Sequence, residues 1–258
     1  PPSGELPVDA FHLMVDQQGE PLYDLAQANF ILSFGIDWLQ AYPSPVEASR
    51  AYGLLRRGRV DRRVRIVQIE PRLSVTAAKS DEWIPIRPGQ EGWLALGIAH
   101  VLIRERFFHE PSVQENASGF EEFARFVESR ATVESVAERT GVPTETIDRL
   151  AREFGLKKGL ALGTRSDLVT QWAVMCLNGL VGNLDARGGL LRRWEPPGLS
   201  LPLPNPPPDQ VAEEGLGAPR PASAEELPAW IASGQPPPLE LLLISQANPC
   251  FLSPSPSR

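Results

Sequence analysis

Four short apolar runs, separated by segments with helical patterning, constrain the fold of this chain most strongly. Each run has the length of a buried strand and stops at a polar or turn residue; they cover residues 30–34, 66–69, 159–163 and 239–244. Helices are predicted between them at 45–57, 91–107, 119–129, 132–140, 144–154 and 167–181. Strands alternating with helices form parallel βαβ units, so we expect an α/β fold with a doubly wound, mostly parallel sheet.

Changes in composition along the sequence predict four regions. Residues 1–27 form an extended N-terminal segment, and residues 28–194 form the α/β core, with a helical insertion at about 108–156. Residues 195–238 are proline-rich and too poor in apolar positions for a core of their own, so we expect a long surface excursion there. Residues 239–258 supply the last strand, an Asn-Pro loop and a tail.

Composition excludes several classes of site. The formal net charge of −7 argues against nucleic acid or an anionic membrane as the main partner. The chain has two cysteines, too few for a Cys-ligated iron–sulfur cluster or structural zinc site, and they are interpreted as packed thiols, with a single disulfide as the alternative; they are Cys176 and Cys250. Three scattered histidines form no metal or nucleophile-activating set, so we assign no catalytic or metal residue; they are His12, His100 and His109.

Charged residues cluster in the loops that follow the predicted strands. Gly35-Ile36-Asp37 and Glu70-Pro71-Arg72 come directly after two of them, and Arg87-Pro88-Gly89 closes the next segment. Ligands of open α/β sheets bind at this carboxyl edge, where arginines suit phosphates and a carboxylate suits ribose or purine donors. Neither GxGxxG nor GxxxxGK[ST] is present, and on spacing alone ordinary surface turns remain the alternative.

A second functional hypothesis concerns residues 133–154, VESVAERTGVPTETIDRLAREF, whose pattern fits a helix-turn-helix. The presumed recognition helix carries Glu145, Asp148 and Glu153, which would repel phosphates. A packed helical pair is therefore the preferred interpretation, and DNA binding is a distant alternative.

Several motifs in a fixed order resemble the molybdopterin oxidoreductases of the dimethyl-sulfoxide-reductase type. They are ILSFGIDWLQAYPSPVEASRAYG, RIVQIEPRLSVTAAKSDEWIPIRPGQEGWLALGIAHVLI, LNGLVGNLDARGG and SQANPCF, and with the helical segment 120–154 they cover most of residues 28–251. The resemblance implies that the matching loops hold the guanine-dinucleotide arm of a molybdopterin cofactor. The residues it assigns to cofactor binding are Gly35, Asp37, Glu70, Arg72, Arg87, Gly89, Glu91 and Asn248.

Within this family, the sequence resembles the large subunit of membrane-bound, quinone-linked complexes, namely the polysulfide-reductase-like enzymes and alternative complex III. The resemblance implies an electron-transfer subunit at the membrane surface, on the periplasmic side or alternatively the cytoplasmic face, with an iron–sulfur module and other subunits as partners and no transmembrane segment of its own. Two positions depart from the family pattern: Glu70 replaces Asp, and Gln90-Glu91 replaces Thr-Asp. The family's metal-ligand and iron–sulfur segments have no counterpart here, so the second hypothesis is a cofactor-free structural scaffold in such a complex.

Overall fold

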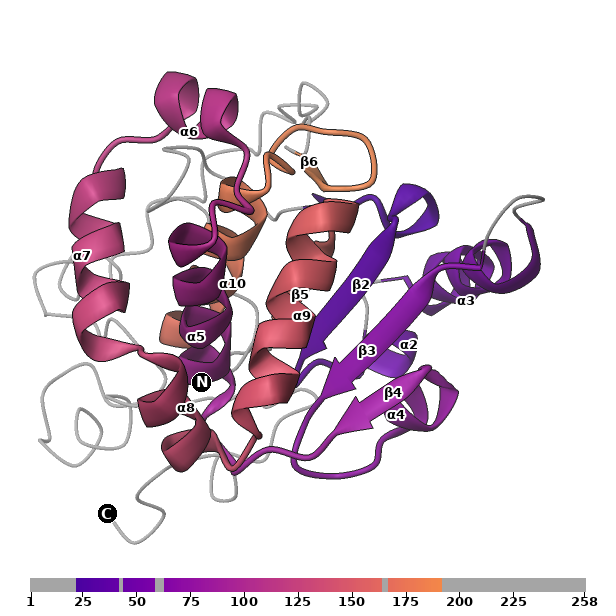
Figure 1. Cartoon of the computed structure of the whole chain (residues 1–258). Coiled ribbons are helices and arrows are strands. Elements are labelled where there is room, and N and C mark those ends of the chain that lie inside the picture. Colours follow the sequence, from indigo (N-terminus) through magenta and orange to yellow (C-terminus); the bar gives the residue numbers. More distant parts are fainter. Residues whose placement is uncertain (1–21, 42–43, 59–62, 164–166, 192–258) are drawn as a thin grey trace, which may run out of the picture. The chain divides into compact units, whose positions relative to one another are not determined.

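The computed structural model describes residues 22–41, 44–58, 63–163 and 167–191 (Figure 1). All of them lie in one compact unit, Gly4–Glu195. The predicted strand at 239–244, the proline-rich excursion and the Asn-Pro loop lie outside the described residues. The four predicted regions of the chain therefore stay a prediction.

The centre of this unit is a four-stranded parallel sheet. Its strand order is β4-β3-β2-β5, with β2 at Phe30–Phe34, β3 at Arg65–Ile69, β4 at Glu82–Ile84 and β5 at Leu160–Gly163. The three predicted strands that fall within the described residues are confirmed. Strand β4 was not predicted, because its three residues, Glu-Trp-Ile, form no apolar run.

Helices surround the sheet, and most begin where the sequence predicts. Their bounds are α2 Trp38–Ala41, α3 Pro45–Gly53, α4 Val75–Lys79, α5 Glu91–Arg104, α6 Glu110–Asn116, α7 Phe120–Arg130, α8 Val133–Thr140, α9 Thr144–Lys157 and α10 Leu168–Leu180. A 3₁₀ turn, η1, covers Leu25–Gln27, and a π-helical turn, η2, extends α3 over Leu54–Gly58. Ser44 caps α3 by accepting from the Glu47 N–H, with Pro45 at the first helical position, as predicted.

Helices cover both faces of the sheet, which confirms the doubly wound α/β fold. Alternate residues of each strand point to opposite faces. Phe30, Leu32 and Phe34 pack on the side of α5, α8, α9 and α10, whereas Ile31 packs on the other side with residues of α2 and α3. Figure 1 shows α9 lying across one side of the sheet and α2, α3 and α4 on the opposite side.

The first and last described segments of the chain are joined by a short antiparallel ribbon. Strand β1 (Leu22–Tyr23) pairs with β6 (Leu190–Leu191), and the Asp24 N–H donates to the Gly189 carbonyl at 2.9 Å. The Gly188 N–H donates to Asp24 Oδ2, also at 2.9 Å. Segments more than 160 residues apart in the chain therefore close the fold.

The strand order contains a reversal that marks the expected position of a ligand. From β2 the chain moves outward to β3 and then β4, and it returns through α5–α9 to place β5 on the other side of β2. At such a switch point the loops at the carboxyl ends of neighbouring strands diverge and leave a crevice. The loops that follow β2, β3 and β4 carry most of the residues assigned to cofactor binding.

Candidate cofactor-binding edge

Three loops meet at the carboxyl edge of the sheet: 35–37 after β2, 70–74 after β3 and 85–90 after β4. Hydrogen bonds join the first two loops to the neighbouring strand, since the Gly35 N–H donates to the Ile69 carbonyl at 2.8 Å and the Glu70 N–H to the Ile84 carbonyl at 3.2 Å. The third loop is joined to the end of α8, where the Arg87 N–H donates to the Thr140 carbonyl at 3.1 Å. Gly35 and Gly89 have φ angles of 67° and 74°, in the left-handed region that glycine adopts without strain. The fold thus brings together the loops that the sequence predicts to form one site.

Asp37 is held in place by the first residues of helix α4. Its Oδ1 accepts hydrogen bonds from the Thr76 hydroxyl and from the Thr76 N–H, the latter at 3.3 Å. The same hydroxyl accepts from the Leu39 N–H at 3.2 Å, so the loop, α2 and α4 are tied at one point. Within the described part of the chain no group donates to Oδ2, which leaves one carboxylate oxygen available to a ligand.

Glu70 is turned inward, and both of its carboxylate oxygens accept hydrogen bonds within the chain. Oε1 accepts from the Ser74 N–H at 2.9 Å, and Oε2 accepts from Gln68 Nε2 at 3.1 Å. The residue is only 4% exposed. Gln68 Nε2 also donates to the Ile36 carbonyl at 3.0 Å, which joins the first loop to the second.

The two arginines of the site differ in what they contact. Arg72 is exposed and makes no hydrogen bond or ion pair with the residues the structure describes. Arg87 instead donates through Nη1 to the carbonyls of Glu138 and Arg139 at the end of α8, at 2.6 and 3.2 Å. A cation at a helix C-terminus satisfies carbonyls that lack intrahelical partners. Arg72 is therefore free to bind an anion, and Arg87 is already bound to the helical insertion.

Glu91 lies in the first turn of α5 and is 7% exposed. Nothing in the described ranges donates a hydrogen bond to its carboxylate, although the N-terminal end of the helix favours a negative charge there. The next residue, Gly92, packs so closely on α10 that an added Cβ would lie 2.9 Å from Thr170 Oγ1. Glu91 is thus a nearly buried acceptor fixed at the junction of two helices.

Sequence reasoning missed the residues that support the site, chiefly Gln68 and Thr76. One signal could have revealed Gln68: it is the polar residue within an apolar strand, and the two-residue period places it on the same face as Glu70. The last predicted residue, Asn248, lies outside the described residues, as does the 164–166 loop after β5. A groove of about 310 Å³ lies elsewhere, between α3 and β1, and contains none of the predicted residues.

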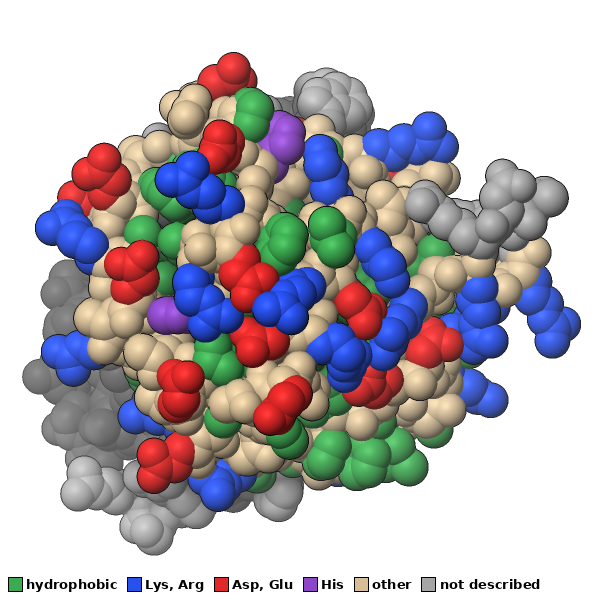
Figure 2. All heavy atoms as spheres, in the orientation of Figure 1, with side chains coloured by type: hydrophobic (Ala, Val, Ile, Leu, Met, Phe, Trp, Pro, Cys, Tyr) green, Lys and Arg blue, Asp and Glu red, His purple; other side chains and the backbone are tan. Residues whose placement is uncertain are grey.

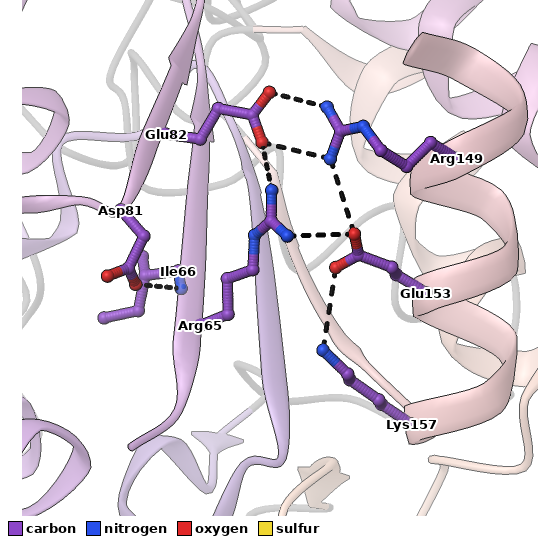
Figure 3. A network of polar contacts seen from close by, with 7 residues as sticks. All are labelled: Arg65, Ile66, Asp81, Glu82, Arg149, Glu153 and Lys157. Carbon is purple, nitrogen blue, oxygen red and sulfur yellow. Dashed lines mark hydrogen bonds and ion pairs between the residues drawn. The ribbon is translucent and has the colours of Figure 1, made fainter. Parts of the chain in front are cut away.

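Helix α9, the presumed recognition helix of the DNA-binding hypothesis, pairs its charges within the protein (Figure 3). Arg149 Nη2 lies 2.6 Å from Glu82 Oε1 of β4, and Glu153 Oε1 lies 2.9 Å from Arg65 Nη1 of β3. Figure 2 shows acidic and basic side chains interleaved on this face rather than a basic surface. These contacts agree with the interpretation of α8 and α9 as a packed helical pair.

Comparison with known proteins identifies relatives over most of the described residues. The family model for molybdopterin oxidoreductase matches residues 12–151. The molybdopterin-containing subunit of the arsenate respiratory reductase from a Shewanella species is 32% identical over 216 residues, which cover 70% of this chain and 24% of the relative. The molybdopterin-binding-like subunit of menaquinone reductase from Nitratidesulfovibrio vulgaris is 27% identical over 246 residues, 92% of this chain and 33% of the relative.

A solved structure supports the fold. Acetylene hydratase from Pelobacter acetylenicus superposes with a TM-score of 0.55 at 23% sequence identity, over 70% of this chain and 25% of that protein. At this identity the likeness concerns the fold alone. In all three comparisons the chain spans only about a quarter to a third of the length of the protein it matches.

Proposed function

Because the chain belongs to the molybdopterin oxidoreductase family, we propose that its α/β unit binds one guanine-dinucleotide arm of a molybdopterin cofactor. The observation that carries this proposal is a set of groups at the carboxyl edge of the sheet that have no partner among the described residues. Asp37 Oδ2, the Arg72 guanidinium and the Glu91 carboxylate are placed by three neighbouring segments, and no described residue binds them.

These groups fit the chemistry of a nucleotide. The guanidinium of Arg72 can bind the diphosphate through charge-assisted hydrogen bonds. Asp37 and Glu91 are acceptors, and they suit ribose hydroxyls and the N–H groups of guanine. When bound, the molybdopterin group supplies redox chemistry at its metal; the residues described here would bind and orient it, and none of them is assigned a catalytic role.

The second candidate function is a cofactor-free scaffold, and one observation favours it. Glu70 and Arg87, two of the eight residues assigned to the site, already have partners inside the chain. Two potential ligand contacts are therefore used by the fold itself. The name of the Nitratidesulfovibrio relative, a molybdopterin-binding-like subunit, is compatible with this alternative.

The proposed setting is a quinone-linked respiratory complex at the membrane surface, where an iron–sulfur module and other subunits would accompany this chain. The menaquinone reductase relative supports the quinone link. None of the helices in the described ranges is both long enough and apolar enough to span a bilayer. Attachment to the membrane through partner subunits is part of this proposal.

Molybdenum and guanine-nucleotide content, measured on the assembled complex, test the proposal. We expect both in the wild-type complex and a strong decrease in both with Arg72→Ala. Arg50→Ala is the matched control, because Arg50 is also exposed without a described partner but lies on α3, away from the site. Absence of both components from the wild-type complex would rule out the cofactor function and leave the scaffold.

A further inference from the structure

A buried pair of polar side chains lies directly beneath the loop that carries Arg72. Gln68, which is fully buried on β3, donates from Nε2 to Glu70 Oε2 at 3.1 Å, while the Ser74 N–H donates to Oε1 at 2.9 Å. Both oxygens of the Glu70 carboxylate thus face into the protein. Arg72, only two residues further along the chain, points to solvent without a described partner.

The orientation of the Gln68 amide is fixed by its neighbours. Nε2 lies against two acceptors, the Ile36 carbonyl at 3.0 Å and Glu70 Oε2 at 3.1 Å. The Oε1 atom has no hydrogen-bond partner among the residues that the structure describes. Exchanging the two atoms would place an oxygen against both acceptors, so the amide must present its donor to Glu70 even though its own oxygen is left unsatisfied.

An unrestrained Glu70 would have a competing partner close by. A carboxylate two residues from an exposed guanidinium can form an ion pair with it, and that pair would occupy the donors that a bound anion needs. The inward hydrogen bonds from Gln68 and Ser74 remove this competitor.

We propose that Gln68 is a positioning residue that holds Glu70 away from Arg72, and thereby keeps Arg72 available for an anion of the diphosphate class. The inference rests on the proposed function, because it concerns the same loop and the diphosphate part of the same ligand. It differs from the role that the family resemblance implies for Glu70. In the structure both oxygens of this carboxylate accept hydrogen bonds within the chain, and we assign it to support of the loop.

Titration of the full chain with inorganic pyrophosphate, followed by calorimetry, tests this arrangement. Arg72→Ala should weaken binding by about tenfold or more, as expected for loss of a charge-assisted contact. Gln68→Leu should weaken it several-fold, because the released Glu70 pairs with Arg72. The double variant Gln68→Leu/Glu70→Gln should return to wild-type affinity, since the competing charge is gone, and Arg50→Ala should change nothing.

The rescue is the decisive readout, because a general loss of stability would not be reversed by a second substitution. Unchanged affinity in Gln68→Leu, no recovery in the double variant, or no binding of pyrophosphate to the wild type would each overturn the inference. If Gln68→Leu does not fold, Glu70→Gln alone decides: affinity should be kept or increased, and a decrease would show that the Glu70 carboxylate supports anion binding instead of competing for Arg72, which would overturn the inference.

The pyrophosphate titration, combined with the molybdenum and guanine-nucleotide assay, separates this inference from the proposed function. Pyrophosphate binding with the expected rescue, in a complex that contains no molybdenum and no guanine nucleotide, would overturn the cofactor proposal and leave the role of Gln68 in place. A complex that contains both components, together with pyrophosphate binding but no rescue in the cofactor-free chain, would overturn only the role of Gln68.

Discussion

At the scale of single residues, the candidate site depends on side chains that hold its carboxylates rather than on the carboxylates alone. The hydroxyl of Thr76 donates to Asp37 Oδ1 and accepts from the Leu39 N–H, and the side chain is fully buried. Valine has nearly the shape of threonine but no hydroxyl. We expect Thr76→Val to lower the free energy of unfolding by about 1–2 kcal/mol, the cost of leaving buried polar groups unpaired.

Urea unfolding of the two proteins measures this difference. The control is Thr146→Val in α9, since the Thr146 hydroxyl has no hydrogen bond among the described residues. An equal effect of both substitutions would mean that the Asp37 contact contributes nothing to stability.

At the scale of elements, the network in Figure 3 joins α9 to the sheet edge. Arg149 contacts both oxygens of Glu82, at 3.1 and 2.6 Å. Its side chain is 36% exposed, so solvent screens part of the interaction. We expect Arg149→Ala to cost about 1 kcal/mol of unfolding free energy at low salt and less at 1 M NaCl.

Arg125→Ala provides the comparison for Arg149. Arg125 pairs with Glu122 one turn away on α7, and both side chains are at least 70% exposed. Such a pair should contribute no more than about 0.5 kcal/mol. If chemical denaturation gives the same cost for both substitutions, the network does not fasten α9 to the sheet.

A second contact between elements makes stability depend on pH. Hydrogen bonds from Arg152 of α9, and then from Arg104 of α5, lower the pKa of Glu105 to about 2 from an ordinary value of 4.5. Between these values the unfolded chain takes up a proton that the folded protein does not, so stability falls as the pH falls. The stabilisation is complete above pH 4.5 and is lost as the pH approaches 2.

Glu105→Gln should therefore be less stable than the wild type at pH 6, and the difference should shrink as the pH falls from 4.5 toward 2. Thermal melts across this range measure the change. Glu128→Gln, at an exposed position of α7 without an ion pair in the described structure, should show a difference that stays small at every pH.

At the scale of the whole molecule, apolar runs were sufficient to predict β2, β3 and β5, and therefore the parallel sheet and the edge that carries the site. Strand β4 and helix α4 were missed because both are short, and because VTAAK has no apolar periodicity. The ends of the predicted strands were sufficient to locate the loops of the site. They did not predict which side chains of these loops already have hydrogen-bond partners in the fold. Glu70 and Arg87 are bound by Gln68 and by the end of α8, contacts that depend on tertiary packing.

Closure of the fold by segments distant in sequence leads to a further prediction. Gly188 has φ 78°, and a Cβ there would lie 2.5 Å from the Gln27 carbonyl oxygen, a backbone atom that cannot move aside. Gly119 has the same φ of 78° but nothing within 4 Å. Alanine at either site incurs the left-handed strain of about 1–2 kcal/mol, whereas only Gly188→Ala also adds overpacking, roughly 1–3 kcal/mol more.

We therefore expect Gly188→Ala to lower the urea midpoint clearly more than Gly119→Ala does. Because Gly188 also donates its N–H to Asp24, the displaced backbone would weaken the β1–β6 ribbon at the same time. Hydrogen exchange should then show faster exchange at the Asp24 and Gly188 amides in Gly188→Ala alone. Equal midpoints for the two variants would mean that the ribbon yields without cost, and that residues 185–191 do not stabilise the α/β unit.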